Sequence, residues 1–584
     1  MNKIIKRRPL PENINLPAHF HPVLRRVLAA RQVSVAMELD YGLQNLLPYT
    51  ALLGIETAVD LLRDALIHQA RILIIADYDA DGATSCAVAM KALRQMGAQK
   101  VGFLVPHREK HGYGLTPEIV ELAVTDSWLV DIAPGNAPDL LITVDNGISS
   151  RDAVAVAKRY GMRVLITDHH SAPAQLPEAD AIVNPNQPGD SFPSKSLCGV
   201  GVIFYVMMAL RARLRDSGWF ATQGITEPNL AQLLDLVALG TVADVVSLDY
   251  NNRILIEQGL RRIRANRCCP GIRALIQVAG RDQTHLVASD LAFYLGPLLN
   301  AAWCMDDMSH GIVCLLSEED TSAGLHAQLL QNFNQERCGE EAKMQQEALT
   351  MIESLGDFQQ LPVGLCLLDE QWHQGVVGIL AARIKDRLHR PVIIFTRDKD
   401  EQIRGSGRSV PGVHIRDILA SIAGQHPQMI TRFGGHAMAA GITIPHCQFN
   451  AFQHQFDQAV RQHLAVEQLQ GIILSDGALL PEDLNLELAE QLRTLTPWGH
   501  HFPEPIFDGE FELLTYRLLK NKHLKMQVRL GKGKQTLEVI AFNSANPHWP
   551  SQVNYIQLAY KLDVNHFRGF KNLQLRAEYV AVLG

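Results

Sequence analysis

The stretch Arg71-Ile-Leu-Ile-Ile-Ala-Asp-Tyr-Asp-Ala-Asp-Gly-Ala-Thr-Ser-Cys86 predicts a strand, an acidic turn and a helix in direct succession. Residues 72–76 are an apolar run typical of a buried strand. Three carboxylates follow at every second position: Asp77, Asp79 and Asp81. Gly82 ends this acidic run, and residues 83–93 have helical character. Because crowded carboxylates repel one another at the ligand-binding edge of an α/β sheet, the stretch predicts a divalent-cation site. The alternative is that the aspartates only cap the helix and the turn.

Two further strands end in acidic residues in the same way. The first, residues 140–144, is followed by Asp145. The second, residues 163–167, is followed by an acid and two imidazoles: Asp168, His169 and His170. Parallel strands bring their carboxyl ends to one edge of the sheet, so these groups should converge. Oxygen-rich sites with one or two imidazoles suit Mn²⁺ or Mg²⁺ better than structural zinc.

Length and composition limit the remaining possibilities. The 584 residues are too many for one hydrophobic core and predict about three to five domains. The net charge of −7 gives no global attraction to nucleic acid, so any such binding must use a local basic face. The nine cysteines form no Cys-x-x-Cys pair, which favours a reducing compartment. We find neither a secretory signal nor an apolar run long enough for a membrane span, and we expect a cytoplasmic protein without membrane contact.

Four motifs in this order resemble the DHH phosphoesterase family. They are Asp77-Tyr-Asp-Ala-Asp-Gly82, Val144-Asp-Asn-Gly147, Asp168-His-His170 and Leu239-Gly-Thr-Val-Ala-Asp-Val-Val246. Within this family the chain is most similar to exonucleases that degrade single-stranded DNA. The resemblance implies an α/β fold in which a parallel-sheet DHH domain is joined by a long helix, predicted at residues 321–355, to a second α/β DHH-associated domain. A C-terminal OB-fold β-barrel should follow.

The resemblance also implies a division of the chain into five parts. These are an N-terminal lead-in at 1–50, the DHH catalytic domain at 51–210, a helical region at 211–355, the DHH-associated domain with its Gly-Gly-His motif at 356–465, and a linker with the OB-fold at 466–584.

By the same resemblance, the site holds a pair of divalent ions, Mn²⁺ or Mg²⁺. Its expected metal ligands are Asp77, Asp79, Asp81, Asp145, His169 and Asp244, with Asp77 in or against the ligand shell. The expected catalytic residues are Asp81, Asp145, His169 and His170. His170 would orient a ligand or transfer a proton. For His170 alone, a buried histidine satisfied by its neighbours is the alternative.

Glycine-rich segments of the second α/β domain are expected to bind substrate. Residues 404–409 contain two arginines and read as a loop that exposes backbone N–H groups to anions. By the resemblance, Ser406 and Arg408 hold a substrate phosphate together with Arg108 of the first domain. The motif glycines and histidine, Gly434, Gly435 and His436, would face the metal site across a cleft, and His436 would contact the scissile region.

The C-terminal part is basic and rich in predicted strands. From Phe511 to Gly584 there are eleven Lys or Arg residues against four Asp or Glu. Several aromatic residues lie among them: Tyr516, Phe542, Tyr555, Tyr560, Phe567 and Phe570. Such a barrel suits single-strand binding through backbone charge and base stacking, and the alternative is that the aromatic residues form the barrel core.

Taken together, these features predict a metal-dependent 5′→3′ exonuclease that hydrolyses single-stranded DNA to mononucleotides in DNA recombination and repair. Two ions would activate the attacking water and stabilise the developing charge. Two alternatives remain: a DHH phosphodiesterase for short oligonucleotides or cyclic dinucleotides, and a non-catalytic DNA-binding relative. The expected partners are single-stranded DNA, a single-strand-binding protein and a helicase, and we expect a monomer.

One segment departs from the family pattern. Gly296-Pro-Leu-Leu-Asn-Ala-Ala-Trp-Cys-Met305 stands where relatives usually read Gly-Pro-Arg-Leu-Asn-Ala-Ala-Gly-Arg-Met. Leu298 and Cys304 thus replace arginines, and Trp303 replaces a glycine. If those arginines contact phosphate, substrate affinity should be weaker here. If they brace the fold, Trp303 fills the space.

Overall fold

The strand predicted at residues 72–76 lies in a five-stranded parallel sheet. The computed structural model describes residues 3–12, 14–107, 114–125, 137–356, 361–464, 469–520, 522–531, 535–544, 553–567 and 570–583. The sheet has the order β3-β2-β4-β5-β6. Its strands are β2 (Ile72–Ala76), β3 (Val101–Leu104), β4 (Leu140–Val144), β5 (Arg163–Thr167) and β6 (Ala181–Val183). The register pairs Ala76 with Val144 and Val144 with Thr167, so β2, β4 and β5 end side by side.

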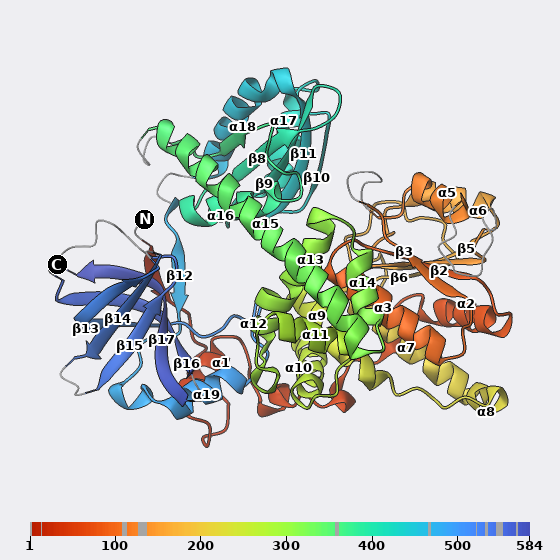
Figure 1. Ribbon diagram of the computed structural model, residues 1–584, viewed down its shortest axis with the longest axis horizontal. Helices are drawn as coiled ribbons and strands as arrows, with labels where there is room; N and C mark the ends of the chain where they lie inside the picture. The colour runs from red at the N-terminus through yellow and green to blue at the C-terminus, as the bar shows by residue number, and fades with distance from the viewer. Residues whose placement is uncertain are drawn as a thin grey trace.

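Helices cover both faces of this sheet (Figure 1). Alternate residues of β2 point to opposite sides, where Ile72 and Ile74 join one core cluster while Leu73 and Ile75 join another. One face is covered by α2 (Ile55–Ile67), α3 (Ala80–Gln95) and α7 (Gly199–Asp216), and the other by α5 (Pro117–Thr125) and α6 (Arg151–Arg159). A strand buried on both faces explains its continuous apolar run.

Helix α3 begins at Ala80, three residues before the predicted start. Asp79 is its N-cap, and its Oδ1 accepts hydrogen bonds from the backbone N–H groups of Asp81 at 2.9 Å and Gly82 at 3.0 Å. The prediction of three acids alternating along an extended turn was therefore wrong, because Asp81 already lies in the first helical turn. A side chain at Gly82 would meet the carbonyl oxygen of Asp77 at 2.3 Å, so glycine is needed for this close approach rather than to break the run.

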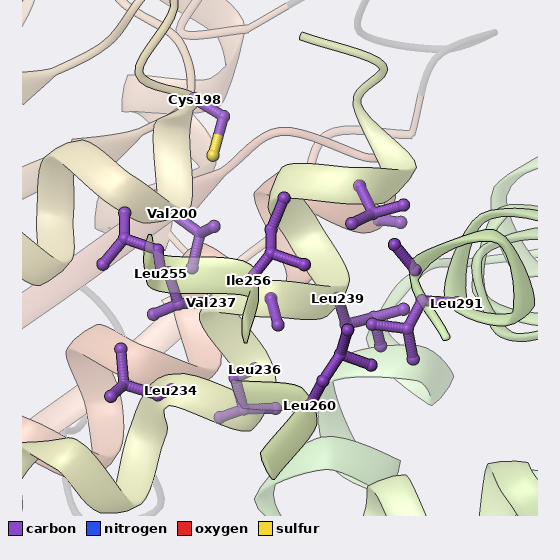
Figure 2. Packing of buried hydrophobic residues seen from close by; sticks show 14 of the residues in the cluster. Cys198, Val200, Leu234, Leu236, Val237, Leu239, Leu255, Ile256, Leu260 and Leu291 are labelled. Atoms are coloured by element: carbon purple, nitrogen blue, oxygen red, sulfur yellow. The ribbon is translucent and has the colours of Figure 1, made fainter. Parts of the chain in front are cut away.

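A helical layer follows the sheet. Its main helices are α9 (Leu234–Ala243), α10 (Tyr250–Arg264), α11 (Pro270–Val278), α13 (Gly296–Met305) and α14 (Ser309–Leu316), with shorter pieces α8 (Trp219–Gln223), α12 (Ala288–Asp290) and a π-helical turn at Leu291–Leu295. Helix α9 is apolar apart from Asp235 and Thr241 and packs against α3, α7 and α10. Figure 2 shows Leu234 and Val237 of α9 among buried side chains that include Val200 of α7 and Ile256 of α10. This packing fixes the end of α9, where Asp244 is the C-cap residue.

A long helix, α15 (Asp320–Ser354), runs from this layer to a second lobe and confirms the predicted connecting helix (Figure 1). The second lobe has a mixed sheet of order β10-β11-β9-β8-β7. Its strands are β7 (Leu365–Leu368), β8 (Val392–Arg397), β9 (Gln402–Arg408), β10 (Arg432–Gly435) and β11 (Ala439–Pro445). Helix α16 (Val377–Leu388) packs on one face, and α17 (Ile415–Gln425) and α18 (Phe449–His463) pack on the other.

The prediction of an open glycine loop at residues 404–409 was wrong. Most of this segment is β9, which pairs antiparallel with both β8 and β11. Its backbone N–H groups therefore face neighbouring strands, and side chains must supply any anion contact. Residues 432–435 are also a strand, β10, and His436 begins the turn into β11.

The chain ends in a closed barrel of order β13-β14-β15-β17-β16. Its strands are β13 (Phe507–Leu519), β14 (His523–Leu530), β15 (Thr536–Ala541), β16 (Tyr555–Phe567) and β17 (Phe570–Leu583), and α19 (Leu486–Thr494) packs beside them. Of the aromatic residues singled out above, Tyr560 belongs to the barrel core. Four others are exposed: Tyr516, Phe542, Tyr555 and Phe570. The side chain of Phe567 lies outside the part of the structure that is described.

The N-terminal segment is bound to the segment that precedes the barrel, through strand pairing and a buried ion pair. Strand β1 (Ile4–Arg7) pairs parallel with β12 (Ile472–Ser475). After α1 (Pro22–Ala29), the guanidinium of Arg31 donates to both carboxylate oxygens of Asp476, at 2.7 and 3.0 Å, and both side chains are buried. None of the helices in the described ranges combines the length and apolar character needed to cross a membrane.

We expect Gly82→Ala to destabilise the first lobe by about 1–3 kcal/mol, because the added methyl would press on the rigid backbone of Asp77. Gly339→Ala is the matched control: nothing lies within 4 Å of a methyl placed there in α15, so stability should rise by about 0.5–1 kcal/mol. Urea unfolding followed by circular dichroism measures both. A G82A protein as stable as the parent would contradict this view of the turn.

Candidate metal centre

Five segments bring acidic and imidazole groups to one edge of the parallel sheet. Asp77 follows β2, Asp145 follows β4, and His169 and His170 lie after β5, while Asp79 and Asp81 come from the start of α3 and Asp244 from the end of α9. Three sets of side chains place ligand atoms within 4.8 Å of one another: Asp77, Asp79 and Asp145; Asp81, His169 and Asp244; and Asp145, His169 and His170. The structure thus brings together all seven first-lobe residues predicted for the metal and its chemistry.

Three buried atoms of this cluster face one another without a hydrogen-bond partner among the described residues. They are Asp145 Oδ1, His169 Nε2 and Asp244 Oδ2. His169 Nε2 lies 3.1 Å from Asp145 Oδ1 and 3.5 Å from Asp244 Oδ2. Buried polar atoms normally find a partner, because leaving one unsatisfied costs about 1–3 kcal/mol. Two carboxylate oxygens and an imidazole nitrogen form a donor set that a hard divalent cation fits.

The charges of the cluster also call for a cation. Burial and the charge of Asp79 raise the pKa of Asp81 from its ordinary value of 3.8 to about 7. Burial followed by neighbouring carboxylates raises the pKa values of Asp77, Asp145 and Asp244 well above the usual range. Burial and the charge of His170 lower the pKa of His169 to about 3, so its imidazole is neutral and able to act as a ligand.

His170 differs from its neighbour. Its Nδ1 lies 2.7 Å from Asp168 Oδ1. Although burial opposes protonation, the hydrogen bond and charge of Asp168 raise the pKa of His170 to about 9. His170 is thus a cation at neutral pH, held at the rim of the cluster with its side chain 32% exposed. It is not a fully buried core histidine, which was the alternative.

Several supporting groups were not predicted from the sequence. The N-terminus of α7 holds Asp81, since the backbone N–H groups of Gly199 and Val200 donate to its carboxylate at 2.7 and 2.9 Å. A side chain at Gly199 would meet Cβ of Asp145 at 2.6 Å, so a glycine is required there. Asp168 also accepts from the backbone N–H of Ile148 at 2.9 Å. A glycine at a helix start was the available signal for Gly199, but nothing local connects residue 199 to residue 81.

Backbone strain accompanies two of the acids. Asp145 has a φ of 63°, and Val245, which follows Asp244, has a φ of 62°. Aspartate tolerates this left-handed conformation, whereas a β-branched valine does so only when the surrounding structure holds it there. The surrounding structure therefore holds the two turns that place Asp145 and Asp244, and Val245 is the residue whose own backbone preference opposes its conformation.

The second lobe faces the cluster across a cleft. A cavity of about 930 Å³ is lined by His170 and Ser149 from the first lobe and by Gly434, Gly435 and His436 from the second. A second cavity, of about 430 Å³, lies beside it and is lined by Tyr78, Trp303, Ser406, Arg408 and His436. We call the smaller one the end pocket. The predicted second-lobe residues thus reach the cleft, whereas Arg108 lies outside the described residues.

Ser406 and Arg408 lie on β9 next to the N-terminus of α16. Arg408 Nη1 donates to Ser406 Oγ at 3.1 Å. A methyl at Gly378, in the first turn of α16, would lie 3.0 Å from Arg408 Nη2 and 3.1 Å from Ser406 Oγ. A guanidinium, a hydroxyl and a helix N-terminus therefore converge, and each of them attracts anions.

Three family models match the chain. They are described as "DHH family, N-terminal domain" over residues 71–241, "DHHA1 domain" over residues 360–462 and "RecJ OB domain" over residues 475–579. A protein of Dickeya dadantii, the single-stranded-DNA-specific exonuclease RecJ, is 51% identical over 578 residues, which cover 99% of this chain and 98% of that protein. The chain belongs to the RecJ family.

Solved structures of RecJ from Thermus thermophilus agree in fold. The complex with Mn²⁺ has a TM-score of 0.77 and 27% identity, covering 96% of this chain and 76% of that one. The complex with Mg²⁺ has a TM-score of 0.73 and 26% identity, covering 96% and 75%. In these two complexes, one RecJ relative holds the kinds of ion that the donor set described above fits.

When the metal ions are removed by a chelator, the repulsion among the buried carboxylates should make the thermal stability of the protein depend on pH. A raised carboxyl or imidazole pKa stabilises the fold below the pKa of the unfolded chain, and this contribution is lost as pH rises through the folded value. Asp81 and His170, with folded pKa values of about 7 and about 9, both act in this sense between pH 6.5 and 8. The lowered pKa of His169 opposes them only near pH 6.5, where the imidazole of the unfolded chain is still about half protonated. With excess EDTA, the melting temperature should therefore fall across this range.

Added Mn²⁺ should raise the melting temperature more at pH 8 than at pH 6.5, since protons compete with the cation for the carboxylates. Differential scanning calorimetry at matched ionic strength measures both trends. A chelated protein that grows more stable from pH 6.5 to 8 would show that the buried acids are not protonated in the metal-free fold.

Proposed function

We propose that this RecJ-family exonuclease degrades single-stranded DNA from the 5′ end and releases mononucleotides. The observation that supports this best is the pairing of a cation-binding edge on one lobe with an anion-binding pocket on the other. The buried ligand atoms of Asp145, His169 and Asp244, which have no hydrogen-bond partner among the described residues, belong to the first lobe. Ser406 and Arg408 belong to the second lobe. A phosphodiester needs both, because it is an anion whose reaction adds further charge.

In this proposal a pair of ions, Mn²⁺ or Mg²⁺, is held by the six predicted ligands: Asp77, Asp79, Asp81, Asp145, His169 and Asp244. When bound, the ions would lower the pKa of water and stabilise charge on the attacking and leaving oxygens. Asp81 is positioned by the N-terminus of α7, and neutral His169 by its place between Asp145 and Asp244.

The protein groups around the ions have separate tasks in this proposal. His170, whose Nδ1 is held by Asp168, offers an imidazole at the rim of the cluster that orients a ligand or transfers a proton. His436 comes from the opposite lobe to the reacting phosphate, since it lines both cavities. Gly434 and Gly435 line the larger cavity without side chains, which leaves room for the strand. A side chain at Gly434 would extend into open space where the strand would pass.

Ser406, Arg408 and the start of α16 would hold the 5′-terminal phosphate. The end pocket is lined by β9, β11 and α16, and in this proposal a strand that enters from the larger cavity would end there. That arrangement favours attack on the bond next to an end rather than within a strand.

The barrel supports a polymer as substrate. Its exposed aromatic residues and basic charge suit several consecutive nucleotides. A phosphodiesterase for short oligonucleotides or cyclic dinucleotides would have no use for such a surface. A non-catalytic relative would not need Asp145 Oδ1, His169 Nε2 and Asp244 Oδ2 to be held close together without hydrogen-bond partners. We also propose the division of domains given above, a monomeric state, a cytoplasmic location, and a single-strand-binding protein and a helicase as partners.

With Mn²⁺, single-stranded DNA labelled at the 5′ end should lose its label as mononucleotide before a 3′ label is released, and blunt duplex should resist. Asp244→Asn should lower turnover by about 100-fold or more, because it weakens a ligand while keeping the size of the side chain. Asp282→Asn, an exposed cap far from the cleft, is the matched control. Release of the 3′ label first would overturn the polarity, and normal turnover by D244N would overturn the ligand assignment.

Arg408→Ala should raise KM for 5′-phosphorylated DNA by about 10-fold and should have less effect on DNA with a 5′-hydroxyl, since a charge-assisted contact contributes roughly 1.5–3 kcal/mol. Arg397→Ala is the control, because its side chain, on neighbouring β8, is 75% exposed. Steady-state kinetics on the two substrates measure the difference. An equal effect of R408A on both would mean that Arg408 does not contact the terminal phosphate.

A further inference from the structure

We infer that Trp303, together with Tyr78, forms an aromatic wall that stacks on the terminal nucleobase of the bound strand. This inference rests on the proposed function and concerns the end pocket. The pocket has two chemically different sides. The second lobe contributes Ser406, Arg408 and the start of α16 to its lining, and the first lobe contributes the two aromatic residues.

The aromatic wall is part of the metal-bearing lobe. Tyr78 lies between Asp77 and Asp79, and its backbone N–H donates to Asp77 Oδ1 at 2.8 Å. Trp303 lies in the last turn of α13, and the ring centroids of the two side chains are 5.3 Å apart. One turn earlier in α13, Asn300 Oδ1 accepts from the backbone N–H of Ala80 at 2.9 Å. Helix α13 is thus tied to the acidic turn, and the aromatic pair is held next to the cluster.

The junction between the lobes fixes the opposite side. A methyl at Gly375, in the loop before α16, would meet the carbonyl oxygen of Cys304 at 2.5 Å. The residue that follows Trp303 therefore touches the second lobe directly. The phosphate-binding side and the aromatic side are held together by this contact, in a cavity of about 430 Å³.

Trp303 is distinct from the other unusual residues of its helix. Leu298 is 1% exposed and Cys304 is 5% exposed, and both are core residues. Trp303 is half-buried and lines the cavity. If it only filled space in the core, it would not reach the pocket wall beside Tyr78.

A terminal nucleotide fits such a pocket because it has an anionic end and an aromatic face. The terminal phosphate would lie at Ser406 and Arg408, and the attached base would lie against the opposite wall. Stacking of a base on an aromatic side chain contributes about 1–3 kcal/mol and tolerates every base. The wall would therefore strengthen binding of the end without selecting sequence.

The test pairs a change in the protein with a change in the substrate. On 5′-phosphorylated DNA, Trp303→Ala should raise KM about 10-fold, and Trp303→Phe should keep most of the affinity. On DNA with an abasic terminal nucleotide, the parent protein should already be weakened by a similar factor, and W303A should lose little more. A loss of equal size on both substrates would overturn the inference, because it would show that Trp303 acts without contacting the base.

A binding measurement separates this inference from the proposed activity. With EDTA to prevent turnover, 2-aminopurine at the 5′ terminus should be quenched by the parent and by W303F but not by W303A, while fluorescence anisotropy shows that the strand is bound. Normal exonuclease activity with quenching independent of Trp303 would overturn the inference alone. Quenching that depends on Trp303 in a protein without turnover would support it and refute the proposed function.

Discussion

The mutual repulsion of buried carboxylates at one edge of a parallel sheet is the constraint on which the rest of the molecule depends. Five aspartates from three separate parts of the chain meet there, and burial raises the pKa of most of them. Such an arrangement persists only if the surrounding fold is rigid enough to hold like charges together. The N-terminus of α7, the capped start of α3 and the fully buried α9 provide that rigidity.

The two lobes divide the recognition of a phosphodiester by charge. The first lobe presents an excess of carboxylate and attracts cations, whereas the second presents a guanidinium, a hydroxyl and a helix N-terminus and attracts anions. Among the residues that the structure describes, neither lobe contains both this carboxylate cluster and this anion-binding group. The contact between Gly375 and Cys304 and the single long helix α15 therefore determine the catalytic geometry as much as the ligands do.

Much of the fold could be predicted from the sequence, for identifiable reasons. Strands β2, β4 and β5 are apolar runs bounded by acids, and α15 is a long stretch without proline, so local pattern and tertiary structure agree. The glycine-rich strands β9 and β10 could not be predicted, because glycine has little preference for strands and the pairing with neighbours imposes the conformation. Likewise, the donors that hold Asp81 come from residues 199 and 200, and no local pattern connects them to it.

The pairing of β1 with β12 has a consequence for biosynthesis. Ile4 lies next to Ile472 in this small sheet, so β1 leaves the ribosome more than 460 residues before the strand with which it pairs. Contacts so distant in sequence form late and slowly. The lobe that carries the acids can therefore fold before β1 pairs with β12.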